Sequence, residues 1–330
     1  MKKNFFKNKN LLITGGTGSF GKALVEYLIK NKFQLKKIII FSRDELKQYE
    51  MSQNLSVKKF PNLRYFLGDI RDKERLQYAV KEVDIVIHSA ALKQVPASEY
   101  NPFEFIKTNI LGAQNVIEAC INSNVSHVLA LSTDKASSPV NLYGATKLCS
   151  DKLFTSAQNI YGKKKITFSV VRYGNVMFSR GSIIPQLLQE KSLGYFSITD
   201  PDMTRFNITL NESINFVLNS LTIQKGGEIF VPKLPSYKLL DLCKAIDEKC
   251  KIKIIGVRVG EKIHEELISS IEARKTLEFK NFYIILGNYE DQSIRLPSRK
   301  DKFVKKNFCY NSEKNKNFLS IKDLNKMIYK

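Results

Sequence analysis

Tryptophan is absent from this chain of 330 residues, and histidine and cysteine are scarce, with three and five copies. The cysteines are scattered and form no CxxC pair, so their spacing predicts neither a zinc site nor a disulfide framework. The histidines show no metal-ligand spacing either, and we expect no bound metal. Apolar runs stay below the roughly 18 residues that a membrane span needs, so we expect no membrane insertion. Residues 1–10 lack the apolar core and cleavage site of a signal peptide, which predicts a cytoplasmic protein.

Acidic residues are also few, at 32 against 53 basic ones, which gives a formal charge of +21. Such a field attracts polyanions. The excess is mostly lysine, spread along the chain and concentrated after Arg299, and no nucleic-acid recognition motif accompanies it. We therefore expect no specific nucleic-acid partner, while an anionic nucleotide substrate would benefit from the same field.

Short apolar runs alternate with helix-length segments in the first half of the chain. The predicted strands cover residues 11–14, 37–41, 63–67, 84–88, 127–132 and 167–172, and the predicted helices include residues 20–31, 102–124 and 142–161. Nearly continuous apolar strands separated by helices indicate a parallel sheet covered on both faces. The pattern predicts an α/β protein with a Rossmann-type, doubly wound sheet.

A glycine-rich turn follows the first predicted strand and opens the first helix. Residues 14–21 read TGGTGSFG, in which three glycines form GxxGxxG. Such a turn brings bare backbone amides to a pyrophosphate at a helix N-terminus. A glycine triplet alone is a weak signal, but its place between strand and helix makes it specific for a dinucleotide. We assign cofactor contacts to Gly15, Thr17, Gly18, Ser19, Phe20 and Gly21.

The end of the second strand distinguishes NAD from NADP. NAD sites usually place an acidic residue there for the ribose 2′-hydroxyl, whereas Ser42 and Arg43 suit a 2′-phosphate. We therefore expect NADP. Asp69, just past the third strand, is placed for an adenine contact, and Ala90, after the fourth, is small enough for the cofactor to pass closely.

The regular alternation ends near residue 175. We expect residues 1–175 to form the NADP-binding Rossmann domain and residues 207–231 to return to it. Residues 176–330 then form mainly a smaller, interleaved substrate-binding domain and the C-terminal tail.

Tyr143 and Lys147 stand four residues apart in the segment YGATK, so a helix places both on one face. A nearby ammonium stabilises a phenolate and lowers the pKa of a tyrosine from about 10. Behind a dinucleotide fold, this pair predicts a base that takes the proton of an alcohol while its hydride leaves to nicotinamide.

Blocks along almost the whole chain resemble the extended short-chain dehydrogenase/reductases. More closely, the chain resembles the inverting UDP-N-acetylglucosamine 4,6-dehydratases that begin pseudaminic acid synthesis, and their capsule-pathway relatives. The blocks include ITGGTGSFGKALV, FSRDELKQ, HSAALKQVP, LSTDKASSPVNLYGATK and GEKIHEELIS. The resemblance implies dehydration of UDP-N-acetylglucosamine with a tightly held NADP that is regenerated in each turnover. It also implies a homo-oligomer, often a hexamer.

Asp134 and Lys135 are the most informative part of this resemblance. Retaining dehydratases carry Asp-Glu here and inverting ones Asp-Lys, whereas a 4-epimerase needs neither the acid nor the base. The resemblance implies that Tyr143 takes the 4-hydroxyl proton, Lys135 takes the carbon 5 proton and Asp134 protonates the departing 6-hydroxyl. For Lys135 to act as a base, its pKa must fall well below about 10.4.

The resemblance also implies contacts on the substrate side. It places Val176 beside the nicotinamide, Arg258 and Glu261 at the nucleotide diphosphate and ribose, and Arg205 either at the substrate or in a structural ion pair. Relatives usually have a glycine near Phe178, which this chain lacks. The substrate contacts that we expect are Lys93, Thr133, Asn175, Arg205, Arg258 and Glu261.

Three alternatives stay open at this point: a UDP-hexose 4-epimerase, a retaining dehydratase, and a regulator that binds NADP without catalysis. A regulator would typically have lost the tyrosine or the lysine, and this chain keeps Tyr143, Lys147, Asp134 and Lys135. The catalytic residues therefore favour an enzyme, and the Asp-Lys pair favours an inverting dehydratase.

Overall fold

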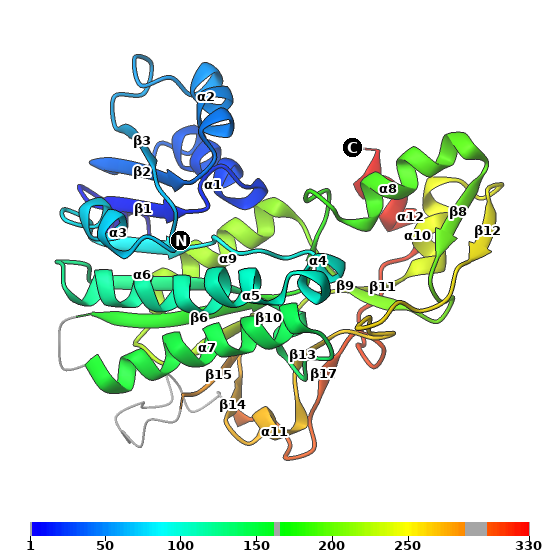
Figure 1. The fold of residues 1–330 in the computed structure, drawn as a ribbon. Coiled ribbons are helices and arrows are strands. Elements are labelled where there is room, and N and C mark those ends of the chain that lie inside the picture. Colours follow the sequence, from blue (N-terminus) through cyan, green and yellow to red (C-terminus); the bar gives the residue numbers. More distant parts are fainter. Residues whose placement is uncertain (1, 162–165, 288–301, 330) are drawn as a thin grey trace.

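The computed structural model describes residues 2–161, 166–287 and 302–329. The first residues of the lysine-rich tail, 299–301, lie outside these ranges. A large, twisted sheet occupies one side of the molecule, and a smaller group of helices and strands lies beside its edge (Figure 1).

Seven neighbouring strands of the large sheet are parallel. Their order is β3-β2-β1-β4-β5-β6-β10. Their bounds are β1 (Asn10–Thr14), β2 (Lys37–Ser42), β3 (Leu63–Leu67), β4 (Ile85–His88), β5 (His127–Thr133), β6 (Thr167–Tyr173) and β10 (Ile229–Pro232). The strand order reverses between β1 and β4, which is the switch point of a doubly wound Rossmann sheet, where ligands bind. The predicted fold is confirmed.

Three antiparallel strands extend the sheet beyond β10. They are β15 (Phe282–Ile285), β14 (Thr276–Glu278) and β16 (Lys302–Phe303), in that order outward. All three come from the last fifth of the chain, so the C-terminal region contributes to the large sheet as well as to the smaller lobe. The division of the chain into two domains stays a prediction.

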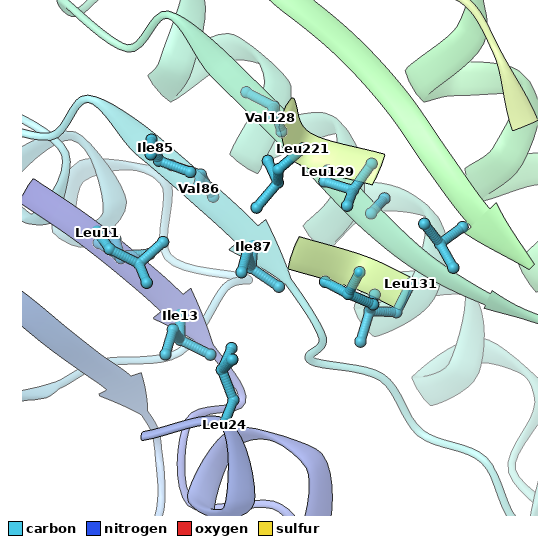
Figure 2. Close-up of a cluster of buried hydrophobic side chains, with 14 of the residues drawn as sticks. Leu11, Ile13, Leu24, Ile85, Val86, Ile87, Val128, Leu129, Leu131 and Leu221 are labelled. Carbon is cyan, nitrogen blue, oxygen red and sulfur yellow. The ribbon is translucent and has the colours of Figure 1, made fainter. Parts of the chain in front are cut away.

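Apolar side chains explain why the central strands form. Every residue of β1 and β4 is buried, because both faces of a parallel sheet are covered by helices. Leu11, Ile13, Ile87 and Leu129 lie in one continuous cluster with Leu24 of the first helix (Figure 2).

Helices cover both faces of the sheet (Figure 1). Those on one face include α6, which packs against α3 and α7, and α1 packs against α9 on the other. Their bounds are α1 (Ser19–Lys30), α2 (Glu45–Asn54), α3 (Lys73–Ala79), α4 (Val95–Tyr100), α5 (Pro102–Phe105), α6 (Gly112–Ile121), α7 (Leu142–Tyr161), α9 (Leu210–Ile223) and α11 (Ser270–Ala273). Among the described residues, no helix is both long and apolar enough to cross a membrane.

The single helix predicted over residues 102–124 is interrupted by a π-helical segment at Ile106–Leu111. This irregularity carries the side chain of Asn109, which is 1% exposed. Asn109 accepts from the backbone N–H of Leu92 at 2.8 Å and donates to its carbonyl at 2.9 Å and to the Thr146 hydroxyl at 3.0 Å. The segment thus ties the loop after β4 to α7, a contact that periodicity does not predict.

The smaller lobe has its own apolar core, built around Leu187, Phe196, Leu242 and Leu324. Its elements are α8 (Ile183–Glu190), β8 (Tyr195–Ile198), α10 (Leu239–Ile246), β12 (Lys251–Ile254) and α12 (Ile321–Ile328). Two further small sheets link it to the large one: β7 (Asn175–Val176) with β9 (Thr204–Ile208) and β11 (Ser236–Lys238), and β13 (Glu266–Ile268) with β17 (Tyr310–Asn311).

Candidate active site

The catalytic turn lies where β5 ends at the carboxyl edge of the parallel sheet. Thr133 is the last residue of β5, and Asp134–Ala136 form one 3-10 turn. The Thr133 hydroxyl donates to Asp134 Oδ1 at 3.0 Å and accepts from the backbone N–H of Lys135 at 3.4 Å. Because ligands of open α/β sheets bind at this edge, the turn places the predicted acid and base at the binding edge.

Two carboxylates hold the ammonium of Lys135. Its Nζ lies 3.1 Å from Asp134 Oδ1 and 2.9 Å from Glu265 Oε1. Asp134 is 0% exposed and Glu265 is 2% exposed. Arg205 Nε lies 3.8 Å from Glu265 Oε1, so a second cation joins the cluster. Asp134 Oδ2 and Glu265 Oε2 are buried with no hydrogen-bond partner among the described residues.

This cluster shifts the pKa of each of its members. Burial and the neighbouring charge of Glu265 raise the pKa of Asp134, although Lys135 lowers it. Burial alone would lower the pKa of Lys135, but Asp134 and Glu265 outweigh burial and raise it. A basic Lys135 requires a pKa well below about 10.4. That condition is not met here, because two buried carboxylates stabilise the ammonium.

Tyr143 and Lys147 lie in the first half of α7 and are both buried. Burial raises the pKa of Tyr143 to about 12, while the charge of Lys135 and a hydrogen bond with Thr133 lower it. Lys147 Nζ donates to the carbonyl of Leu131 at 2.8 Å. Lys135 is thus the cation that most favours the phenolate of Tyr143, and the same role for Lys147 stays a prediction.

The glycine turn leaves no room for side chains between β1 and α1. A Cβ on Gly15, whose φ is +65°, would lie 2.9 Å from the Cα of Ala90. A Cβ on Gly21 would lie 2.6 Å from the Cα of Gly16. The backbone of this turn therefore faces the site directly at the N-terminus of α1, the geometry that accepts a pyrophosphate. The turn fits a dinucleotide.

Ser42 is the last residue of β2, Arg43 follows it, and Asp69 follows β3, the neighbouring strand. The Ser42 hydroxyl accepts from the amide of Gln48 at 3.0 Å and keeps its own proton to donate. Arg43 Nη1 lies 3.7 Å from Asp69 Oδ2. Burial opposes ionisation of Asp69, but its hydrogen bonds with Arg71 and the charge of Arg43 lower its pKa. A 2′-phosphate would thus compete with Asp69 for Arg43.

A cavity of about 570 Å³ joins the glycine turn to the smaller lobe. Predicted residues that line it are Gly15, Gly18, Ser19, Phe20, Gly21, Lys93, Thr133, Lys135, Tyr143, Lys147, Asn175, Val176, Arg205, Arg258 and Glu261. Six predicted residues do not line it: Thr17, Ser42, Arg43, Asp69, Ala90 and Asp134. Asp134 lies behind Lys135, and Ala90 lies directly beneath Gly15.

The substrate side of the cavity is built mainly by backbone contacts and ion pairs. Lys93 Nζ donates to the carbonyl of Arg180 at 2.6 Å. The backbone N–H of Arg258 donates to Glu261 Oε2 at 3.3 Å, and Arg205 Nη2 lies 3.7 Å from Glu261 Oε1. Arg205 therefore takes part in ion pairs and also lines the cavity, and its contact with the substrate stays a prediction.

Glu265 is the main residue of the site that the sequence did not reveal. It lies 130 positions after Lys135, just before β13. The pair of glutamates in GEKIHEE was visible, but an acidic pair before a short apolar run is also typical of a solvated surface. Only the fold shows that Glu265 is buried against the catalytic turn.

Fold and site together define a short-chain dehydrogenase/reductase, with a glycine turn for a dinucleotide and a tyrosine and a lysine at the carboxyl edge of the sheet. The sequence profile of a family described as "Polysaccharide biosynthesis protein" matches residues 11–286. The chain belongs to this family, among the extended short-chain dehydrogenase/reductases that include the inverting UDP-N-acetylglucosamine 4,6-dehydratases.

Named relatives and a solved structure support this placement. A "UDP-N-acetylglucosamine 4,6-dehydratase (inverting)" of Campylobacter jejuni is 52% identical over 98% of each chain. A "UDP-glucose 4-epimerase" of Rickettsia bellii is 44% identical over 85% of this chain and 83% of its own. The X-ray structure of Pen from Bacillus thuringiensis superposes with a TM-score of 0.89, at 38% identity over 98% of each chain.

Proposed function

We propose that the protein is an NADP-dependent UDP-N-acetylglucosamine 4,6-dehydratase that inverts carbon 5. The product is UDP-2-acetamido-2,6-dideoxy-β-L-arabino-hex-4-ulose, a precursor of pseudaminic acid or of a related surface-glycan sugar. One observation carries the proposal: buried Asp134 and partly exposed Lys135 form an ion pair beside Tyr143, in a chain 52% identical to enzymes named for this reaction.

Each catalytic side chain has a task in this reaction. A bound nicotinamide dinucleotide supplies a hydride acceptor for carbon 4 and the hydride that later reaches carbon 6. The phenolate of Tyr143 accepts the proton of the 4-hydroxyl. The positive charge of Lys135 favours this phenolate, because it lowers the pKa of Tyr143. The resulting 4-keto group acidifies carbon 5. Asp134, once it has received a proton, gives that proton to the departing 6-hydroxyl, and its raised pKa favours the protonated form.

Lys135 takes the proton of carbon 5 once its ammonium has released a proton. The nearest acceptor for that proton is the Asp134 carboxylate at 3.1 Å. Transfer from the ammonium to this carboxylate leaves a neutral amine and a neutral carboxylic acid, so one step produces both the base and the acid. The pair carries no net charge before or after the transfer, which limits the free-energy cost of moving the proton in a buried site.

Cationic groups at the cavity mouth suit the nucleotide diphosphate. We assign Arg258 and Glu261 to the diphosphate and ribose, and Lys93, Thr133, Asn175 and Arg205 to the sugar side. The cavity lining includes every one of these residues. Val176, from β7, is assigned to the nicotinamide face.

A UDP-hexose 4-epimerase is the second candidate, because relatives at 44% identity carry that name. An epimerase reduces its 4-keto intermediate directly and has no use for a buried acid and base beside carbons 5 and 6. The Asp134–Lys135 pair therefore favours the dehydratase.

NMR on a reaction with UDP-N-acetylglucosamine in heavy water, without added cofactor, tests the proposal. We expect a 4-keto-6-deoxy sugar with deuterium at carbon 5 and the L-arabino configuration. The xylo configuration would contradict inversion, and a sugar inverted only at carbon 4 would identify an epimerase. Tyr143→Phe is the control for background reaction, because it removes the group that accepts the first proton.

The cofactor and the assembly are tested separately. Ser42 and Arg43 support NADP over NAD, and chromatography of the dinucleotide released by denaturing the purified protein identifies it. NAD alone would contradict the proposed role of Arg43. We also propose a cytoplasmic homo-oligomer, for which sedimentation of the purified protein gives the subunit number.

A further inference from the structure

Two adjacent glutamates at the start of β13 contact the catalytic turn from one side. Glu265 Oε1 accepts from Lys135 Nζ at 2.9 Å. Glu266 Oε1 accepts from the hydroxyls of Ser137 and Ser138 at 2.8 Å and 2.7 Å. One glutamate thus reaches the catalytic ammonium, and the other contacts the loop that follows it and also accepts from Cys309 Sγ at 2.9 Å.

The position of Glu265 is fixed by the C-terminal region of the chain. Its backbone N–H donates to the hydroxyl of Ser312 at 2.9 Å, and its carbonyl accepts from the backbone N–H of Ser312 at 2.8 Å. Ser312 is fully buried and follows β17, which pairs with β13. A buried carboxylate held this rigidly must be compensated by a cation, because its desolvation is costly.

Charged and titratable groups from several elements face this carboxylate. Lys135 is the closest cation, Arg205 Nε lies at 3.8 Å, and Lys262 adds a third positive charge. Asp134 is the other carboxylate of the cluster. The remaining groups coupled electrostatically to Lys135 are Lys93, Tyr143 and Tyr237.

We propose that Glu265 is a positioning residue that holds the Lys135 ammonium against Asp134 and sets the pH at which Lys135 becomes a base. The proposal rests on the proposed function, in which Lys135 exchanges a proton with carbon 5. Glu265 lines the cavity beside Lys135, but in this proposal it takes no proton in the cycle. Its fixed negative charge favours the ammonium between turnovers and opposes the early loss of the Lys135 proton.

Glu265→Gln tests the role of this charge. The amide has the shape of the carboxylate and an oxygen that still accepts from Lys135, but it carries no charge. We expect the midpoint of Lys135 titration to fall by about 1–3 pH units, the usual effect of losing an opposite charge at this distance. The acidic limb of the pH profile of kcat/KM for dehydration should move in the same direction.

Competitive labelling with acetic anhydride across pH, read by peptide mass spectrometry, measures this midpoint without turnover. Lys135 is accessible enough for the reagent, since 24% of its side chain is exposed. Glu266→Gln is the matched control: it should leave the Lys135 midpoint in place, because Glu266 does not contact that ammonium. Glu265→Asp keeps the charge but withdraws it by one methylene from the 2.9 Å contact with Lys135, so it should lower the midpoint by less than Glu265→Gln does.

An unchanged Lys135 midpoint in Glu265→Gln, or an equal shift in Glu266→Gln, would overturn the proposal. If Glu265→Gln fails to fold, the Lys135 midpoint is compared between Glu265→Asp and Glu266→Gln. A lower midpoint in Glu265→Asp alone supports the role of Glu265, and equal midpoints in the two variants refute it. The wild-type protein can fold and titrate as expected without turning over the substrate. If it leaves UDP-N-acetylglucosamine unchanged, but Glu265→Gln lowers the Lys135 midpoint, the result refutes the proposed substrate and supports the role of Glu265.

Discussion

Phe178 occupies a backbone conformation that glycine prefers, with φ at +57°. It lies in the loop after β7, where relatives usually have a glycine nearby, and its side chain is 45% exposed. A residue with a Cβ costs roughly 1–2 kcal/mol in this conformation, and glycine avoids that strain. Glycine also loses more conformational entropy on folding, which offsets part of the stabilisation. We expect Phe178→Gly to be more stable than Phe178→Ala by about 1 kcal/mol in urea unfolding. Equal stability would show that the loop bears no strain here.

His88 is predicted to stay neutral in the folded protein. It is 1% exposed, its Nδ1 lies 2.8 Å from the Thr14 hydroxyl, and burial together with the charge of Lys147 lowers its pKa to about 3. The unfolded chain binds a proton at this histidine below about pH 6.5. His88 therefore stabilises the fold fully above that pH, and the contribution is lost by about 1.4 kcal/mol per pH unit as the pH falls toward 3.

Proton NMR of the imidazole resonances checks this behaviour. The chain has three histidines, so His127→Gln and His264→Gln suffice to assign them. The His88 resonance should not titrate between pH 7 and about 4, given the direction of its shift. A midpoint near its ordinary value would mean that the imidazole is solvated in the folded state.

Helix α7 and the catalytic turn are in direct contact at Gly144. A Cβ at this position would clash with the carbonyl oxygen of Lys135, which belongs to the backbone and cannot turn away. Gly144→Ala should therefore displace the turn and lower kcat by roughly 100-fold, the effect of a misplacement of about 1 Å. Turnover of UDP-N-acetylglucosamine measures the effect.

Ala145→Gly is the control for that experiment. It weakens the helix by about 1 kcal/mol without adding an atom, so it should lower stability and leave kcat near the wild-type value. If both variants lose activity equally, helix stability rather than contact with the turn controls the site.

The elements that the sequence predicted best are those with local signals. The strand predicted at residues 127–132 is observed at His127–Thr133, and the helix predicted at 142–161 is observed at Leu142–Tyr161. Apolar runs and periodicity specify such elements. The antiparallel strands β14 and β15 were not predicted, because β15 pairs with β10, which is distant in the chain, and β14 joins the sheet only through β15.

The same distinction holds within the site. The glycine turn and the Asp-Lys pair could be located because their residues are adjacent in sequence. The direction of the Lys135 pKa could not, because it depends on the buried charges of Asp134 and of Glu265, which the fold brings from 130 positions away. Charge patterns along a chain do not show which side chains share a buried volume.

At the scale of the whole molecule, Arg172 joins the parallel sheet to the C-terminal region. It lies in β6, is 0% exposed, and Nη2 is 3.1 Å from Asp151 Oδ2 in α7. Its Nη1 is 3.0 Å from Glu272 Oε1 in α11 and donates to the carbonyl of Leu267 in β13 at 3.1 Å. One guanidinium thus connects α7, which carries Lys147, and β13, which directly follows Glu265, to the sheet.

Arg172→Met is expected to lower the free energy of unfolding by about 3–5 kcal/mol, because it leaves the buried Asp151 without its partner. Urea unfolding followed by circular dichroism measures it, at one protein concentration for all variants. Lys233→Met is the matched control, since it breaks the exposed ion pair between Lys233 and Glu278, 2.6 Å apart, which contributes about 0–1 kcal/mol.

Equal losses of unfolding free energy in the two variants would show that Arg172 does not hold the C-terminal region against the sheet. A loss confined to Arg172→Met, recovered in part by adding Asp151→Asn, would show that the buried charge pair does.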